Sequence, residues 1–99
     1  MYARAVTIQL QLDKIAEAGA IMEEVAETLQ GQAGFHEATM LADRATGQGQ
    51  IITLWETEED MRASEGTSYR EAMGRLAATF AAPPQRQTFA VIMQTTRSE

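Results

Sequence analysis

Few side chains in this 99-residue sequence can perform acid–base or nucleophilic chemistry. Cys is absent and His36 is the only His, which excludes thiolate nucleophiles and requires any multi-His metal site to pool ligands from several chains. The predicted catalytic residues are therefore His36, which can accept a proton near neutral pH, and Tyr69, whose hydroxyl follows a helix start. Each also has a structural interpretation, a solvent-facing His or a Tyr with its ring on the surface.

Aromatic and thioether side chains suggest where a substrate binds. Trp55, the only Trp, can stack on a planar ligand or simply fill the space between a sheet and its helices. Phe35 and Phe80 are predicted walls of the same site. Met61 and Met73 are flexible enough for an adaptable apolar cavity, and they suit a core without a cavity equally well. We therefore predict binding of a small apolar or aromatic metabolite.

The charge balance excludes other classes of partner. Fourteen acidic and eight basic residues give a net charge of −6, the wrong sign for a phosphate-binding surface, so nucleic acid is not an expected partner. The chain has no apolar run of membrane-spanning length and no signal-peptide pattern, so we expect no membrane association and a cytoplasmic location. Arg75 lies four residues after Glu71 and can pair with it on one helix face.

The first half of the chain predicts a strand, a helix and a hairpin. Apolar residues alternate strictly over 5–12, which is typical of a strand. Asp13 stands where a helix N-cap belongs, and an apolar stripe at helical spacing follows over 15–30. Residues 35–43 and 50–56 then form two extended segments around a Gly-containing turn, a pattern typical of a β-hairpin.

The second half predicts a broken helix and a last strand. Thr57 is an expected N-cap before a run of acidic residues. Gly66 interrupts the helix, and Ser68 with Glu71 forms a capping box that restarts it. Two prolines at 83 and 84 end the helical region, and residues 87–96 alternate as a strand.

The order strand, helix, strand, strand, helix, strand predicts an α+β fold of the ferredoxin-like βαββαβ type with an antiparallel sheet. No linker or repeat divides the sequence, so we expect residues 1–99 to form one domain.

Apolar residues on both faces of the later strands indicate a partner. Ile51 and Trp55 alternate with Ile52 and Leu54, and Phe89 lies in a similarly apolar strand. A second apolar sheet face normally marks an interface, and two such faces packed together would make a barrel-like homodimer. The alternative is a monomer in which Thr and Ala make the second face tolerable in water.

With this element order, the chain resembles the antibiotic-biosynthesis-monooxygenase-like family of dimeric α+β barrels. The resemblance covers the whole length in element order, and its most characteristic piece is the strand that passes into the second helix over 51–60. The broken helix with Ser68 and Tyr69, and the loop at 32–35, also match. The resemblance implies the dimeric barrel and a cofactor-free oxygenase, so no cofactor and no metal are expected.

Departures from the family pattern narrow the chemistry. The haem-degrading branch uses an Asn, a second Trp and a helical His, whereas this chain has no Asn, only Trp55, and Met73 or a neighbour at the His position. In the polyketide-oxidising branch an Asn and a Tyr flank the substrate, and the matching residues here are Ile51 and Met61. Only Trp55 transfers directly, with Arg75 as a possible counterpart of a basic pocket residue.

The resemblance implies a monooxygenase that acts on a small aromatic phenol or quinol between sheet and helices. The alternatives are a binding module or stress-related dimeric barrel that performs no turnover, and a partner-binding adaptor. The replacement of polar family positions by Ile51 and Met61 favours the non-catalytic module.

Overall fold

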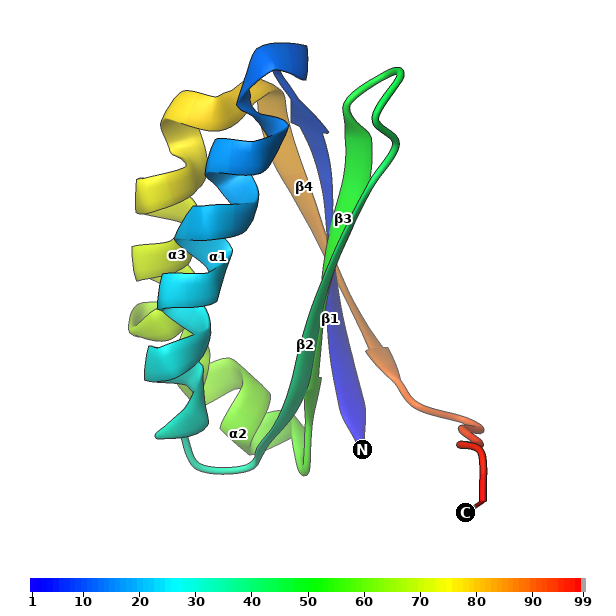
Figure 1. The fold of residues 1–99 in the computed structure, drawn as a ribbon. Coiled ribbons are helices and arrows are strands. Elements are labelled where there is room, and N and C mark those ends of the chain that lie inside the picture. Colours follow the sequence, from blue (N-terminus) through cyan, green and yellow to red (C-terminus); the bar gives the residue numbers. More distant parts are fainter. Residues whose placement is uncertain (99) are drawn as a thin grey trace.

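The computed structural model describes residues 1–98 and has two layers, a four-stranded sheet and a layer of helices on one of its faces (Figure 1). The strands are β1 (Tyr2–Leu10), β2 (Phe35–Ala42), β3 (Gln48–Trp55) and β4 (Phe80–Ala90), and the helices are α1 (Ile15–Gln30), α2 (Glu58–Ala63) and α3 (Ser68–Leu76). Short 3-10 turns precede α1, join α2 to α3 and follow α3. This is the expected ferredoxin-like α+β fold.

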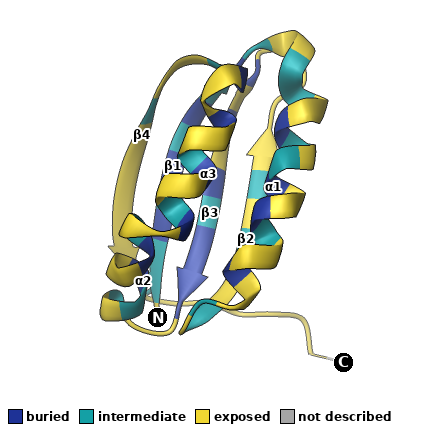
Figure 2. Cartoon of the chain, turned by 90° about the vertical axis from the view of Figure 1, so that its left-hand side faces the viewer, coloured by how far each residue is buried: buried dark blue, intermediate teal, exposed yellow. Residues whose placement is uncertain are grey.

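The sheet has the order β2-β3-β1-β4, and every neighbouring pair is antiparallel. In β1, buried and less buried residues alternate because successive side chains point to opposite faces. Val6, Ile8 and Leu10 face the helices, and the register places Ile51 of β3 opposite Val6. The core therefore lies between the two central strands and the inner faces of α1 and α3 (Figure 2).

Gly47 makes the tight connection between β2 and β3 possible. Its φ of 80° lies in the left-handed region, which residues with a Cβ rarely adopt. An added Cβ would also lie only 2.3 Å from the Leu10 carbonyl oxygen. The backbone of this turn is tied to β1, since the Leu10 N–H donates to the Gly47 carbonyl over 2.8 Å. The hairpin expected from the sequence is confirmed.

The end of the first strand differs from the sequence prediction. β1 begins at Tyr2 and ends at Leu10, and Leu12 is 59% exposed instead of facing the core. The Gln11 backbone N–H donates to the Thr79 carbonyl, which turns the chain away from the sheet. Asp13 does not cap α1, because a 3-10 turn at Leu12–Lys14 intervenes and the helix has no side-chain cap.

The broken second helical region is confirmed, but its capping differs in part. Thr57 caps α2 as expected, accepting a hydrogen bond from the Asp60 backbone N–H over 3.1 Å. The predicted capping box of Ser68 and Glu71 is wrong. The Glu71 N–H donates to the Thr67 carbonyl, and Ser68 lies buried at the start of α3.

The last strand starts earlier than predicted, at Phe80, and ends at Ala90 instead of continuing to residue 96. Pro83 and Pro84 lie inside it. Proline cannot donate a ladder hydrogen bond, but β4 is an edge strand and the prolines fall where the register with β1 shifts. Residues 91–98 continue beyond the sheet without helix or strand.

The sheet face away from the helices is open in this chain (Figure 1). The register aligns Leu54, Ala3 and Phe89 across this face, and Ile52 pairs with Ala5 in the next row. Phe89 and Leu41 are each 50% exposed. Across residues 1–98, no helix is both long and apolar enough to span a membrane.

Candidate functional site

Trp55 is the last residue of β3. Its side chain is fully buried on the helix-facing side, and its indole N–H donates to the Thr53 hydroxyl over 3.0 Å. The Phe35 ring packs against it edge to face, with ring centres 5.5 Å apart and planes at 70°. The two aromatic rings form a fixed apolar wall.

A cavity of about 30 Å³ lies beside Trp55, between the sheet and the helices α1 and α3. Most of its lining is apolar, and a space of this size holds about one water molecule or one oxygen-sized group. The lining residues are Arg4, Val6, Met22, Val25, Leu29, Ile51, Thr53, Trp55, Ser68, Tyr69, Ala72 and Met73.

Arg4 is the charged residue of this lining and is only 3% exposed. Its terminal nitrogens donate to the Met61 carbonyl over 2.6 Å and to the Ser64 hydroxyl over 3.1 Å. Ser64 also donates to the Met61 carbonyl over 2.6 Å. These bonds hold the guanidinium against the turn between α2 and α3 and fix its position.

Tyr69 lies between two guanidinium groups. Cζ of Arg4 lies 4.7 Å and Cζ of Arg86 lies 5.1 Å from the centre of the Tyr69 ring, and both distances are in the range of cation–π contacts. Glu65 lies 3.7 Å from both Arg4 and Arg86. Burial lowers the pKa of the Arg4 guanidinium, while the Glu65 carboxylate opposes that shift. The cluster thus carries two positive charges and one negative charge.

Two buried polar atoms of the cavity lining lack a hydrogen-bond partner within the described part of the chain. They are Nε of Arg4 and Oγ of Ser68, whose residues are 3% and 1% exposed. An unpaired buried donor is costly, and nearly all such groups in folded proteins find a partner. Both residues line the cavity, so these two atoms are its candidate donors for a ligand.

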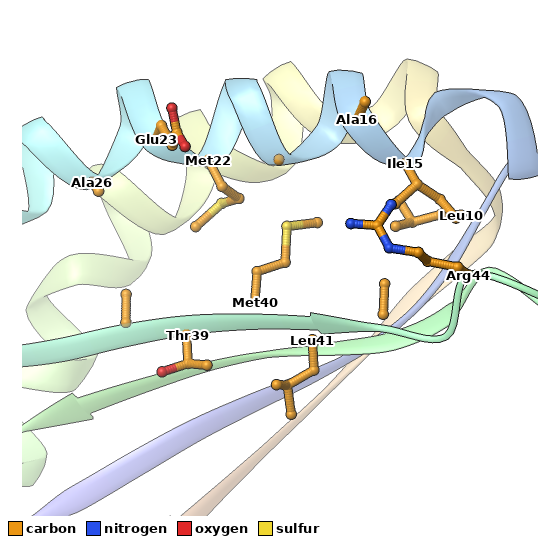
Figure 3. A pocket seen from close by; sticks show the side chains of 13 residues that line it. Leu10, Ile15, Ala16, Met22, Glu23, Ala26, Thr39, Met40, Leu41 and Arg44 are labelled. Carbon is orange, nitrogen blue, oxygen red and sulfur yellow. The ribbon is translucent and has the colours of Figure 1, made fainter.

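A larger groove of about 640 Å³ lies between α1 and β2 (Figure 3). Its lining is mostly apolar, and Met22 and Met40 extend into the space between the helix and the strand. Met22 lines the cavity beside Trp55 as well. The two hollows therefore adjoin at the Met22 side chain.

The structure brings together only some of the predicted site residues. Trp55, Tyr69 and Met73 line the cavity, and Phe35 packs behind Trp55. Met61 is buried, and its carbonyl is an acceptor for Arg4. These residues come from β3, from the start of β2 and from the broken helical region.

His36 lies outside this group. It is exposed at the start of β2 and forms a hydrogen bond with the exposed Glu56 carboxylate. That hydrogen bond, together with the charge of His36, lowers the pKa of Glu56. His36 does not line the cavity beside Trp55 or the groove beside α1.

Arg75 and Phe80 also lie away from the cavity lining. Arg75 is on the exposed side of α3 and pairs with Glu24 of α1, so the expected pairing with Glu71 is wrong. Phe80 is partly buried where β4 begins and packs against the core.

Arg4 and Ser68 are two of the lining residues that the sequence did not identify as ligand-binding candidates. A signal for Arg4 was present, because the alternation of Val6, Ile8 and Leu10 places residue 4 on the same inner face when extended backwards. A charged residue on the core face of a central strand is rare and marks a site. Ser68 carried no such signal, since Ser at a helix start usually serves as a cap.

Among residues 1–98, no three His, Asp or Glu side chains gather closely enough to hold a metal ion. The family model for antibiotic biosynthesis monooxygenases matches residues 1–76. No curated protein has a matching sequence.

Many solved structures share the fold. A provisionally named antibiotic biosynthesis monooxygenase from Nitrosomonas europaea superposes with a TM-score of 0.78 at 17% identity, over 94% of this chain and 100% of that one. SnoaB from Streptomyces nogalater, a cofactor-independent oxygenase, superposes with a TM-score of 0.77 at 15% identity, over 97% of each chain. A protein of unknown function from Nitrosomonas europaea gives 0.78 at 12% identity, over 99% of this chain and 95% of that one.

Proposed function

Because this chain belongs to the antibiotic biosynthesis monooxygenase family, we propose that it is a cofactor-independent monooxygenase for a small aromatic phenol or quinol. The observation that carries the proposal is the mostly apolar cavity beside Trp55, with hydrogen-bond donors in its lining. The fold shared with the cofactor-independent oxygenase SnoaB supports it.

The reaction needs a substrate that is reducing once it loses a proton. A phenolate gives one electron to O₂, and recombination of the resulting radicals forms the new carbon–oxygen bond. Loss of water from the hydroperoxide then yields a quinone. One oxygen atom enters the product and the other leaves as water, so the substrate supplies every electron. The protein's tasks are to hold the anion, exclude water and manage protons.

Tyr69 is the better placed of the two predicted acid–base residues. It lines the cavity, and the two guanidinium groups on its ring lie at 4.7 and 5.1 Å. His36 is bonded to Glu56 at the surface. We therefore assign proton exchange with the substrate to Tyr69, while Trp55, supported by Phe35, forms the apolar wall of the cavity that receives the substrate oxygen.

The aromatic ring needs more room than the cavity offers. A volume of about 30 Å³ takes one substituent, whereas the adjoining groove of about 640 Å³ lies in the range of small-molecule sites. Met22 lies between the two, and a flexible thioether side chain can move aside at low cost. In this arrangement the aromatic ring of the substrate lies in the groove, and its phenolate oxygen extends past Met22 into the cavity.

Oxygen consumption tests the proposal. The purified protein, treated with chelator and freed of flavin, is given a panel of phenols, quinols and hydroxyanthrones. We expect consumption of one O₂ per quinone formed, at a rate that scales with protein concentration. Uptake that is no faster than without protein for every compound would contradict a monooxygenase.

The second candidate is a non-catalytic module that binds a small apolar metabolite. The small size of the cavity favours it, as do the apolar residues Ile51 and Met61 where oxygenases of the family carry polar ones. Binding measured by calorimetry without oxygen consumption would favour this module over the enzyme.

We also propose that two copies of the chain pack through the open sheet face. The surface formed by Ala3, Ala5, Ile52 and Phe89 is apolar, and no helix of residues 1–98 covers it (Figure 1). Burial of such a face yields about 25 cal/mol for each square ångström removed from water. Ile92 and Met93, which are 91% and 77% exposed beyond β4, add to the apolar surface available to a second copy.

Light scattering at micromolar concentration tests the homodimer. We expect a mass of two chains for the natural protein and of one chain for Ile52→Asp. The matched control is Leu12→Asp, which places the same charge at an exposed Leu before α1, away from the open face. A monomeric natural protein, or a dimeric Ile52→Asp variant, would contradict this interface.

A further inference from the structure

The geometry points to a binding site for the ionised oxygen of an acidic phenol or enol, formed by Nε of Arg4 and Oγ of Ser68 in the lining of the cavity beside Trp55. This inference rests on the proposed function and names the form in which the substrate is held. Both residues line the cavity, and both atoms are buried and unpaired within residues 1–98.

The donors are already in place before any ligand binds. Each terminal nitrogen of Arg4 donates one hydrogen bond, to the Met61 carbonyl or the Ser64 hydroxyl, and Nε is the guanidinium nitrogen that has no partner within residues 1–98. Ser68 is the first residue of α3, where the helix dipole is positive. Because neither group needs to reorganise, each can stabilise an anion more strongly than a mobile surface side chain.

The hydroxyl of Thr53 is a third donor in the cavity lining. The Thr53 oxygen accepts the Trp55 indole hydrogen over 3.0 Å, so its own proton is available for donation. Thr53 is 8% exposed and lines the same cavity. Among residues 1–98 no carboxylate lines the cavity, so each of its polar side chains can donate a hydrogen bond and one of them, Arg4, carries a full positive charge.

The local charge selects an anion over a neutral oxygen. The whole chain carries a net charge of −6, but within residues 1–98 Arg4 and Arg86 share a single close carboxylate, that of Glu65. Most of the remaining lining is apolar, and in such surroundings a charged pair interacts more strongly than in water. A phenolate or enolate fits this site, whereas an ether oxygen gains little from the positive charge.

Paired probes test the inference by calorimetry. The first is 2-hydroxy-1,4-naphthoquinone, which is an anion at neutral pH, and the second is its neutral analogue 2-methoxy-1,4-naphthoquinone. The natural protein is expected to bind the anion at least ~10-fold more tightly, since hydrogen bonds to charged groups are the strong ones. Quenching of Trp55, the only Trp, reports that the ligand lies at this site.

Ser68→Ala is the decisive variant. Its hydroxyl has no partner in residues 1–98, so its removal is expected to leave the melting temperature unchanged or raised. Affinity for the anion should fall ~10-fold while affinity for the methoxy analogue stays the same. Ser98→Ala, which removes an exposed hydroxyl beyond β4, is the matched control and should change neither affinity. Arg4→Lys, which keeps the charge but lacks Nε, should weaken binding of the anion alone.

Several results would overturn the inference. They are equal affinity of the natural protein for both probes, failure of the anionic probe to bind, and an anion affinity that Ser68→Ala leaves unchanged. Oxygen consumption measured on the same preparation separates this failure from failure of the proposed function. A protein that consumes oxygen but does not prefer the anion remains a monooxygenase without this anion site.

Discussion

The two hollows of this chain differ in size and in chemistry. The groove between α1 and β2 has a volume of about 640 Å³, is open to solvent and has a mostly apolar lining. The cavity beside Trp55 has only about 30 Å³, yet it contains a buried guanidinium and two unpaired donors. The larger volume of the groove therefore suits the aromatic ring of a substrate. The donors of the small cavity, which have no partner within residues 1–98, suit its ionised oxygen.

The contrast follows from the sheet register. Arg4 and Thr53 are paired across β1 and β3, and the next inward row consists of Val6 and Ile51. One row of the same two strands is thus polar and the next is apolar. The neighbouring row positions on β2, Ala38 and Met40, line the groove. A ligand that spans both hollows meets the Arg4 and Thr53 row in the cavity and the Ala38 and Met40 positions in the groove.

The largest expected effect comes from filling the small cavity. Ala72 is buried in its lining, and Ala72→Leu adds a volume greater than the space available. We expect kcat for any demonstrated substrate to fall at least ~100-fold because the reacting oxygen can no longer enter, with a stability loss of about 1–3 kcal/mol from overpacking. Ala26→Leu, in the groove lining, is the control and should retain most of kcat. A fully active Ala72→Leu variant would remove the small cavity from the mechanism.

The second effect concerns stability. Arg4→Met removes the hydrogen bonds to the Met61 carbonyl and the Ser64 hydroxyl, and it removes the contact with Tyr69. We expect the free energy of unfolding to fall by about 2–3 kcal/mol in urea denaturation, since these bonds are charge-assisted and buried. Arg62→Met, which removes an exposed pair with Glu58, should cost less than about 0.5 kcal/mol. Equal losses of unfolding free energy in the two variants would mean that the buried hydrogen bonds of Arg4 add no more stability than an exposed ion pair.

The third prediction separates binding of the substrate ring in the groove from the reaction at the small cavity. Gly19 lies in the groove lining, and a Cβ there meets no atom within 4 Å. Gly19→Leu should therefore fold well and occupy part of the groove. We expect KM to rise several-fold with kcat nearly unchanged, the reverse of Ala72→Leu. Gly19→Ala is the matched control, and it should stabilise α1 by about 0.5–1 kcal/mol without changing KM. A fall in kcat with unchanged KM would contradict the assignment of the groove to ring binding.

Much of the fold was predictable because periodicity reports burial directly. The alternation of Val6, Ile8 and Leu10 indicated a strand with one buried face, and the Gly-containing turn indicated the hairpin that contains Gly47. The end of β4 was not predictable from alternation alone. Whether residues beyond Ala90 remain in the sheet depends on pairing with β1, whose own strand begins only at Tyr2.

The candidate site was less predictable than the fold. Trp55, Tyr69 and Met73 were identified by residue type, and the structure brings them together. His36 was chosen as the only imidazole, a criterion that takes no account of position. The inner-face position of Arg4 follows from the alternation of β1, but which atoms of Arg4 and Ser68 lack partners depends on the turn between α2 and α3, which the sequence pattern does not describe.

The smallest expected effect concerns His36, at the surface and outside both hollows. The hydrogen bond from His36 lowers the folded-state pKa of Glu56, so this contact stabilises the fold at pH above the ordinary Glu pKa. The stabilisation is lost as the pH falls through the lowered value. His36→Ala should therefore reduce the melting temperature slightly near neutral pH, with a difference from the natural protein that vanishes in acid. Glu56→Gln should give a similar loss, and the double variant little more, because the two side chains form one contact. Oxygen consumption should be unchanged in His36→Ala, whereas a large fall in kcat would move the acid–base chemistry from the cavity to this surface pair.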